Sequence, residues 1–366
     1  MANTSIEWTR GDDGTEGRVW NCLRGCSRIS AGCGDATGGG CYAERMAHRF
    51  SAPGLPYNGL TRLTKSGARW TGDVVFVPEM LDAPLHWRKP SRIFVNSMSD
   101  WCHPKVTNEQ RAAMFGVMAA CPQHEFQLLT KRPAEMLDWF KWLDEQRNDD
   151  GTFPLTVDLL RRHLTTHKIN APCAPSIEWP LPNVHLGVTC ENQPTADERI
   201  PLLLQCPAAV HWISVEPMLS SIVVPQLNEL QWVVCGGESG SNARPMHPAW
   251  PRSLRDQCRD AGVPFFLKQW GEWAPWMDES KFYATAKDDR RDRWQPWMLP
   301  DGTSGTCEIY DDDATWTNWT GDPGNNPDDI CVFSRVGKKA AGHILDGQEY
   351  RMRPGDSWEG ARDATR

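Results

Sequence analysis

Four cysteines with the spacing of a ligand-binding loop lie near the amino terminus, at Cys22, Cys26, Cys33 and Cys41. The residues between them are rich in Gly and Ser, and six glycines from Gly25 to Gly40 let the backbone turn sharply. No apolar periodicity connects these cysteines, so they do not share one helix face. Several thiols on one flexible loop can surround a metal, and thiolates select zinc or an iron-sulfur cluster.

The spacing of the cysteines favours a cluster over zinc. A structural zinc site usually has four protein ligands, often as two close C-x2-C pairs, whereas three, six and seven residues separate the successive cysteines here. A cluster held by three of these thiolates would keep one iron open for an exogenous ligand. The simpler alternative is a set of ordinary buried thiols, which is a good account of a single cysteine but a poorer one of four in a glycine-rich loop.

The rest of the chain must supply the scaffold that positions this loop. Short apolar runs predict strands at 92–97, 125–130, 183–189, 210–216, 230–235 and 263–268, and helical spacing predicts helices at 108–120, 133–142, 196–204 and 250–261. Strands that alternate with helices predict right-handed β/α units and a parallel sheet, open or closed into a barrel. Residues 51–69, rich in Pro, Gly and Thr, are expected to be a connection.

A short polar phrase follows each predicted strand. The phrases cover residues 96–100, 130–133, 189–191, 214–217, 236–240 and 268–271. The carboxyl ends of parallel strands lie on one face of a β/α barrel, where ligands bind. One such phrase could be a helix cap or a turn, but six together predict the rim of a polar pocket.

Length and composition indicate a large globular protein. The chain has 366 residues, of which 40% are hydrophobic and 23% charged. It contains no run of eighteen apolar residues, and Met1 to Arg10 lack the apolar stretch of a signal peptide. The odd number of cysteines, thirteen, argues against a secreted disulfide scaffold. We therefore expect a cytoplasmic protein with no membrane partner.

The net charge of −8 argues against binding of nucleic acid by bulk attraction. Local basic segments at 65–69, 88–92 and 131–132 could still contact phosphates, although a solvated face is their commoner meaning. The nineteen tryptophans could stack on bases or sugars, but large aromatic side chains more often form the core or line a groove.

Several segments together carry a family resemblance. They are S-I-E-W-T (residues 5–9), the cysteine loop with its closing C-Y-A-E, R-I-F-V-N-S-M-S-D, L-T-K-R-P, G-G-E-S-G, A-R-P-M-H-P, F-L-K-Q-W-G (266–271) and R-V-G-K-K-A-A-G (335–342). In this set the sequence resembles the phage-borne three-Cys-motif proteins, a family similar to radical S-adenosylmethionine enzymes. The resemblance runs to about Trp273 and returns at residues 335–347.

The resemblance implies a partial (β/α)6-type barrel whose first loop holds a 4Fe-4S cluster through Cys26, Cys33 and Cys41. The open iron would bind the amino and carboxylate groups of S-adenosylmethionine, and an electron from a reducing donor would cleave it to a 5′-deoxyadenosyl radical. Radical S-adenosylmethionine enzymes typically have a C-x3-C-x2-C pattern, and the three-Cys-motif family has six and then two intervening residues. Here the second gap has seven residues, as if G-D-A-T-G were inserted, and Gly40 replaces the aromatic residue before the third cysteine. Cys22 is the alternative ligand.

The polar phrases offer partners for such a cofactor. A methionine moiety needs acceptors for its ammonium group and donors for its carboxylate. We assign cofactor binding to Ser97, Asp100 and Glu238 as acceptors, Lys131 or Arg132 as the carboxylate clamp, and Gly236 and Gly237 as points of close backbone approach. The remaining rim charges, Glu191, Glu216, Arg244 and Lys268, are assigned to the substrate and its chemistry.

The sequence divides into three parts. Residues 1–273 are expected to form the barrel, 274–334 an irregular Trp- and Asp-rich insertion or lid, and 335–366 a helix packed on the barrel followed by a disordered tail from Arg351. Asp311 to Asp313 lack the ligand spacing of a calcium loop and are expected to be solvated.

Three functions fit these observations. The first is a radical S-adenosylmethionine enzyme that acts on a nucleobase, a nucleotide or nucleic acid in a bacterial or phage-infected cell. The second is a non-catalytic nucleic-acid-binding protein with a structural zinc or iron-sulfur site. The third is a cluster-free barrel hydrolase that uses Asp100, Glu216 and Glu238 as acid and base.

Overall fold

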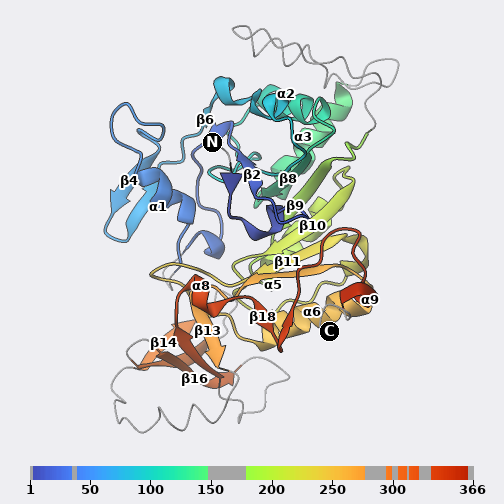
Figure 1. Ribbon diagram of the computed structural model, residues 1–366. Coiled ribbons are helices and arrows are strands. Elements are labelled where there is room, and N and C mark those ends of the chain that lie inside the picture. Colours follow the sequence, from blue (N-terminus) through green and yellow to red (C-terminus); the bar gives the residue numbers. More distant parts are fainter. Residues whose placement is uncertain are drawn as a thin grey trace.

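The centre of the molecule is an eight-stranded sheet (Figure 1). This computed structural model describes residues 3–34, 39–146, 179–276, 294–298, 304–310, 313–320 and 331–361. The strands, in their order across the sheet, are β1 (Asn3–Thr4), β2 (Gly17–Trp20), β7 (Arg92–Val95), β8 (Glu125–Thr130), β9 (Val184–Thr189), β10 (Val210–Val215), β11 (Trp232–Gly236) and β12 (Phe265–Gln269). From β2 to β12 every neighbouring pair is parallel, and β1 joins β2 antiparallel. The sheet ends at β1 and β12, so it is an open, partial barrel, as predicted.

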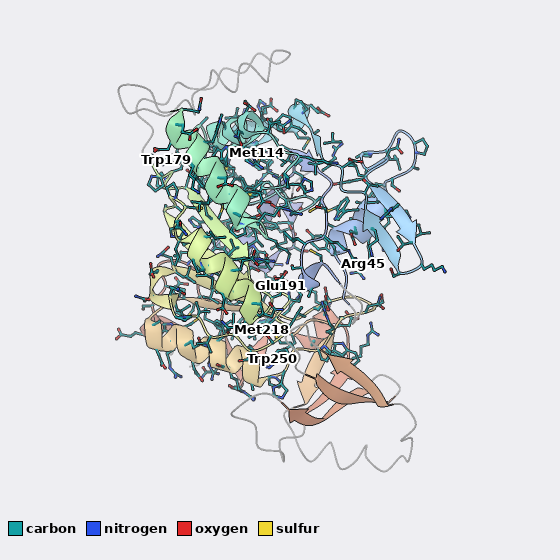
Figure 2. The ribbon with its side chains drawn as sticks, turned by 180° about the vertical axis from the view of Figure 1, so that it is seen from behind. Arg45, Met114, Trp179, Glu191, Met218 and Trp250 are labelled. Atoms are coloured by element: carbon teal, nitrogen blue, oxygen red, sulfur yellow. The ribbon has the colours of Figure 1, made fainter. Side chains whose placement is uncertain are left out.

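Helices follow the strands along the chain. They are α1 (Tyr42–His48), α2 (Asn108–Ala119), α3 (Pro133–Glu145), α5 (Gln193–Leu203) and α6 (Ala249–Ala261). Helix α2 begins with a capping box between Thr107 and Gln110, and α5 begins with one between Asn192 and Thr195. Helices α3, α5 and α6 stack along one side of the molecule (Figure 2). No helix in the described ranges is long and apolar enough to cross a membrane.

The inside of the partial barrel is filled with aromatic side chains. Trp8 packs with Phe94, Trp212, Trp232 and Phe266 in one buried cluster. Strand β9 makes room for the ring of Trp212 through Gly187, since a Cβ there would lie 2.6 Å from the indole nitrogen. These tryptophans are core residues, in agreement with the commoner meaning of the tryptophan-rich composition.

Two small two-stranded sheets lie beside the cysteine loop. Strands β3 (Leu23–Arg24) and β6 (Val75–Phe76) pair, and so do β4 (Thr61–Thr64) and β5 (Gly67–Trp70). The β4–β5 hairpin lies within the segment that was expected to be a connection. Its turn at Lys65 and Ser66 lets four residues on each side pair. It projects from the sheet together with α1 (Figure 1).

A second sheet follows the barrel. Its antiparallel strands are β13 (Trp273–Trp276), β14 (Trp294–Met298), β15 (Ser304–Tyr310), β16 (Asp313–Thr320) and β17 (Cys331–Arg335). The segment expected to be irregular therefore contains strands, which the Thr and Trp residues of β16 favour. Residues 277–293, 299–303, 311–312 and 321–330 lie outside the described residues, so the assignment of a lid and of its boundaries stays a prediction.

The carboxyl-terminal segment returns to the barrel. Helix α8 (Lys338–Ala341) is shorter than the expected helix because Gly342 adopts a positive φ of 66°, and β18 (Ile344–Leu345) and β19 (Gln348–Glu349) form a hairpin. The expectation of disorder from Arg351 is wrong for its first residues. The backbone of Arg351 forms an antiparallel β-bridge with Phe266 of β12. Trp358 begins helix α9 (Trp358–Ala361), and its indole donates a hydrogen bond to the carbonyl of Val263.

Candidate metal centre

Three of the four loop cysteines come together at the carboxyl ends of the strands. Cys26 follows β3, Cys33 ends the 3-10 helix Ala31–Cys33, and Cys41 caps α1. Burial, the largest cause, and charge on Asp100, Cys41 and Cys33 together raise the pKa of Cys26 to about 12, against the opposing effect of Arg132. Each thiol is therefore close enough to feel charge on the others. Iron-sulfur clusters are held by thiolates gathered in this way.

The fourth cysteine points elsewhere. The Cys22 side chain is fully buried in the main core, where its Sγ lies 3.8 Å from Oδ1 of Asn96. Burial raises the pKa of the Cys22 thiol, and no other cysteine contributes to that shift. Cys22 is a core residue, so the structure separates it from the other three.

The gathered thiols do not form a site for a single ion. Within the described ranges, no group of three or more His, Cys, Asp or Glu side chains could hold one metal ion. Sulfurs around one zinc lie about 3.8 Å apart, as follows from a tetrahedral site with Zn–S bonds of about 2.3 Å. In the described residues the three thiols are therefore not arranged around one zinc ion.

Arg132 lies next to Cys26, the first of the three gathered cysteines. Its Nη1 donates to Oδ2 of Asp100 at 2.6 Å and lies 3.9 Å from Sγ of Cys26, while Nη2 donates to the carbonyl and the hydroxyl of Ser27. Asp100 also accepts from Thr130 at 2.7 Å. Both Asp100 oxygens are thus occupied by the chain, which makes Asp100 a support of the loop rather than a free acceptor for an ammonium group.

Glu191 holds the middle of the loop. Its carboxylate accepts from the hydroxyl of Ser30 at 2.5 Å, from Arg199 at 3.0 Å and from the ammonium group of Lys131. Burial opposes ionisation of Glu191, but the charges of Lys131 and Arg199 outweigh it and lower its pKa to about 2. Glu191 lies near the middle of the molecule, between the stacked helices and the side of α1 that Arg45 marks (Figure 2).

Glu238 and Arg244 hold the same loop from strand β11. Arg244 donates to both carboxylate oxygens of Glu238, at 2.9 and 3.0 Å, and to the carbonyl of Ala31 at 3.0 Å. Gly39 passes directly over this pair with a φ of +72°, and its amide donates to the carbonyl of Asn242. The pair therefore clamps the cysteine loop, although the sequence assigned its members to cofactor and substrate.

Further contacts of the loop involve residues that the sequence analysis did not single out. Arg28 donates to the carbonyl of Gly34 and forms a 2.6 Å ion pair with Glu44, and Glu44 also accepts from the amide of Trp70. Tyr42 donates through its hydroxyl to the carbonyl of Ser97 at 2.5 Å. Arg28, Glu44 and Tyr42 lie inside or directly beside the loop, so their position next to the cysteines is the signal that could have identified them.

The mouth of the barrel holds a second ion pair. Lys268 of β12 donates to Oε1 of Glu216 at 2.6 Å, and its ammonium group lies 4.2 Å from the ring centre of Trp8. A Cβ on Gly236 would lie 3.5 Å from the Glu216 side chain, so this glycine faces the same space. Burial is the principal cause of the raised pKa of Tyr42, and charge on Glu216 raises this pKa as well. Among the described residues, no hydrogen bond joins Glu216 or Lys268 to the cysteine loop.

One predicted cofactor contact has a packing role instead. A Cβ on Gly237 would lie 2.6 Å from the carbonyl carbon of Trp270, so this glycine lets β11 approach the end of β12. Ser97 donates to Asn21 and presents its carbonyl to Tyr42. The structure accordingly gathers the predicted site residues at one end of the barrel, but Arg132, Glu191 and Arg244 bond to the cysteine loop rather than facing open space.

The sequence matches a family model over nearly its whole length. The model, described as "Protein of unknown function (DUF5131)", covers residues 3–354, which include the cysteine loop and the main sheet. No curated protein matches the sequence. Among solved structures, the chain is similar to a mutant of spore photoproduct lyase, with 11% sequence identity and a TM-score of 0.32, over 85% of this chain and 73% of that one.

Proposed function

We propose that this chain, which belongs to the DUF5131 family, is a radical S-adenosylmethionine enzyme with a 4Fe-4S cluster on Cys26, Cys33 and Cys41. The observation that carries the proposal is the meeting of these three thiols over the carboxyl ends of a parallel partial barrel, with Cys22 turned into the core. The cysteine motif and the other segments that resemble the three-Cys-motif proteins support the same function.

The donor set fits such a cluster. Three thiols from one loop leave one iron without a protein ligand, as a cosubstrate requires. The cations Arg132 and Arg28 lie close enough to interact with charge on the cysteines, which would stabilise thiolates. Burial raises the pKa of Cys26 and of Cys41, so cluster binding would release their protons. When bound, the cluster supplies the electron for reductive cleavage of S-adenosylmethionine.

The chain's own residues orient and enclose the reacting groups. Arg132, Glu191 and Arg244 bond three points of the cysteine loop to the segments that follow β8, β9 and β11, which holds the loop against the barrel. Glu216 and Lys268 offer a carboxylate and an ammonium group at the barrel mouth, where they can bind complementary charges of a substrate. The aromatic cluster beneath them closes the barrel and excludes water.

The cysteine assignment is tested by metal content. We expect that Cys26→Ala, Cys33→Ala and Cys41→Ala each abolish iron and sulfide binding after anaerobic reconstitution, whereas Cys22→Ala retains both. A Cys41→Ala protein with an intact cluster would contradict the assignment. Zinc instead of iron in the wild-type protein would favour the non-catalytic alternative.

A further inference from the structure

A groove runs along the open side of the partial barrel. It has a volume of about 1020 Å³ and lies between residues 5–14, strand β12 and residues 338–356. Lys268 lines this groove and also forms the ion pair with Glu216 at the barrel mouth. The groove therefore leads to the site of the proposed chemistry.

The groove is more basic than the protein as a whole. Its walls carry six Lys and Arg side chains, namely Arg10, Lys268, Lys338, Lys339, Arg351 and Arg353, against four Asp and Glu side chains. This excess of two positive charges stands in a chain of net charge −8. A local reversal of sign of this kind attracts an anionic ligand.

The acidic side chains of the groove already have partners within the chain. Glu7 pairs with Lys338 at 3.2 Å, and Asp12 pairs with Arg353 at 2.5 Å. Glu349 accepts from His343 and Arg351, and the fourth carboxylate, Asp356, accepts from the amide of Arg353 at 2.8 Å. The carboxylates of the groove are therefore paired within the chain, except that Oε2 of Glu7 is buried without a hydrogen-bond partner among the described residues.

Several cationic donors are left over. Among the described residues, Nη1 of Arg351 and Nε of Arg353 are buried without a hydrogen-bond partner, and Arg10 and Lys339 form no ion pair. Burial lowers the pKa of Arg351, and the charge of Arg10 lowers it further against the effect of Glu349. These two guanidinium groups repel each other, and an anion between them would relieve that repulsion.

We infer that this groove binds the phosphate groups of a nucleoside phosphate, either a free nucleotide or a unit of a nucleic acid strand, and presents it to the barrel mouth. Guanidinium groups bind phosphate oxygens through paired hydrogen bonds, and lysine adds charge. The inference names a substrate class for the proposed enzyme and rests on that proposal for the chemistry. Binding itself requires no turnover, so the two can fail separately.

The test measures binding to the full-length protein by fluorescence anisotropy. The probes are a labelled single-stranded oligonucleotide and labelled AMP, with inorganic phosphate and polyglutamate as competitors. The double variant Arg10→Gln/Lys339→Gln removes two unpaired cations of the groove. We expect it to weaken oligonucleotide binding about tenfold and to reduce the slope of log K against log salt by about 1.4, since each single-strand phosphate contact contributes about 0.7.

The control is Arg49→Gln/Arg62→Gln, which removes the same charge from exposed positions at the end of α1 and in the β4–β5 hairpin. It should leave both probes bound as tightly as in the wild-type protein. Tight binding of the oligonucleotide would identify a strand as the source of the phosphate, and binding of AMP alone would identify a nucleotide. Binding of neither probe, equal competition by polyglutamate, or equal losses in the two double variants would overturn the inference.

Discussion

Arg132 and Asp100 form a buried ion pair at 2.6 Å that joins the ends of two neighbouring strands directly beneath Cys26. Asp100 follows β7 and Arg132 follows β8, and their side chains are only 9% and 4% exposed. The same guanidinium group donates to the carbonyl and hydroxyl of Ser27. The position of Cys26 is therefore set by the parallel sheet and not by the loop alone.

Removal of one partner of this pair should destabilise the whole barrel. We expect Arg132→Met to lower the free energy of unfolding by about 3–5 kcal/mol, because it leaves the Asp100 carboxylate buried without its cation. Urea denaturation monitored by tryptophan fluorescence measures this loss. The matched control is Lys141→Met in α3, whose partner Asp138 is exposed, and it should change stability by less than about 1 kcal/mol. Equal effects of the two substitutions would show that the buried pair does not support the fold.

Two glycines of the cysteine loop should respond differently to the same substitution. A Cβ on Gly32 would lie 2.8 Å from Cδ of Glu191, which Ser30, Lys131 and Arg199 hold in place, whereas a Cβ on Gly40 meets no atom within 4 Å.

Gly32→Ala should therefore cost about 1–3 kcal/mol through overpacking and lower the iron content after reconstitution. Gly40→Ala should leave stability within about 1 kcal/mol of the wild-type value. Denaturation and iron analysis of both variants check this prediction, and a Gly32→Ala protein that reconstitutes fully would contradict the close packing of the loop on Glu191.

Glu191 should make the stability of the fold depend on acid pH. Its pKa is lowered from 4.5 to about 2 in the folded protein, so its ionised form stabilises the fold above about pH 4.5. That contribution, about 3 kcal/mol at full ionisation, is lost as the pH falls from about 4.5 to 2. In Glu191→Gln this component is absent.

The difference in unfolding free energy between wild type and Glu191→Gln should accordingly narrow on acidification through this range. Glu198→Gln, at an exposed position of the same helix, serves as the control. Between wild type and Glu198→Gln, the difference in unfolding free energy should change with pH by no more than a few tenths of the change seen for Glu191→Gln. A constant gap between wild type and Glu191→Gln would show that Lys131 and Arg199 do not hold the carboxylate ionised.

The alternation of apolar strands and helices was sufficient to predict most of the main sheet. Strand β8 has the predicted bounds, and the other five predicted strands differ by at most a few residues. Strand β2 was missed because Gly17–Trp20 is short and lies next to the cysteine loop, without a helical pattern after it. The β4–β5 hairpin was missed because Gly, Pro and Thr dominate its surroundings.

The sequence predicted which residues lie at the site better than it predicted their roles. Parallel strands bring their carboxyl ends together whatever the side chains do, so the sequence could place Asp100, Glu191 and Glu238 on one rim. It could not show which charge pairs with which. Contacts such as Arg244 with Ala31, 213 residues apart, depend on the packing of the loop on the barrel.

In the proposed function, the three thiols hold a cluster that acts on S-adenosylmethionine. The most direct test of this function uses the anaerobically reconstituted protein, which is analysed for iron and sulfide and then incubated with S-adenosylmethionine and a strong reductant. We predict about four irons per chain and release of 5′-deoxyadenosine, with both lost in Cys26→Ala and retained in Cys22→Ala. A protein without iron, or with a full cluster and no reductive cleavage, would contradict the claim.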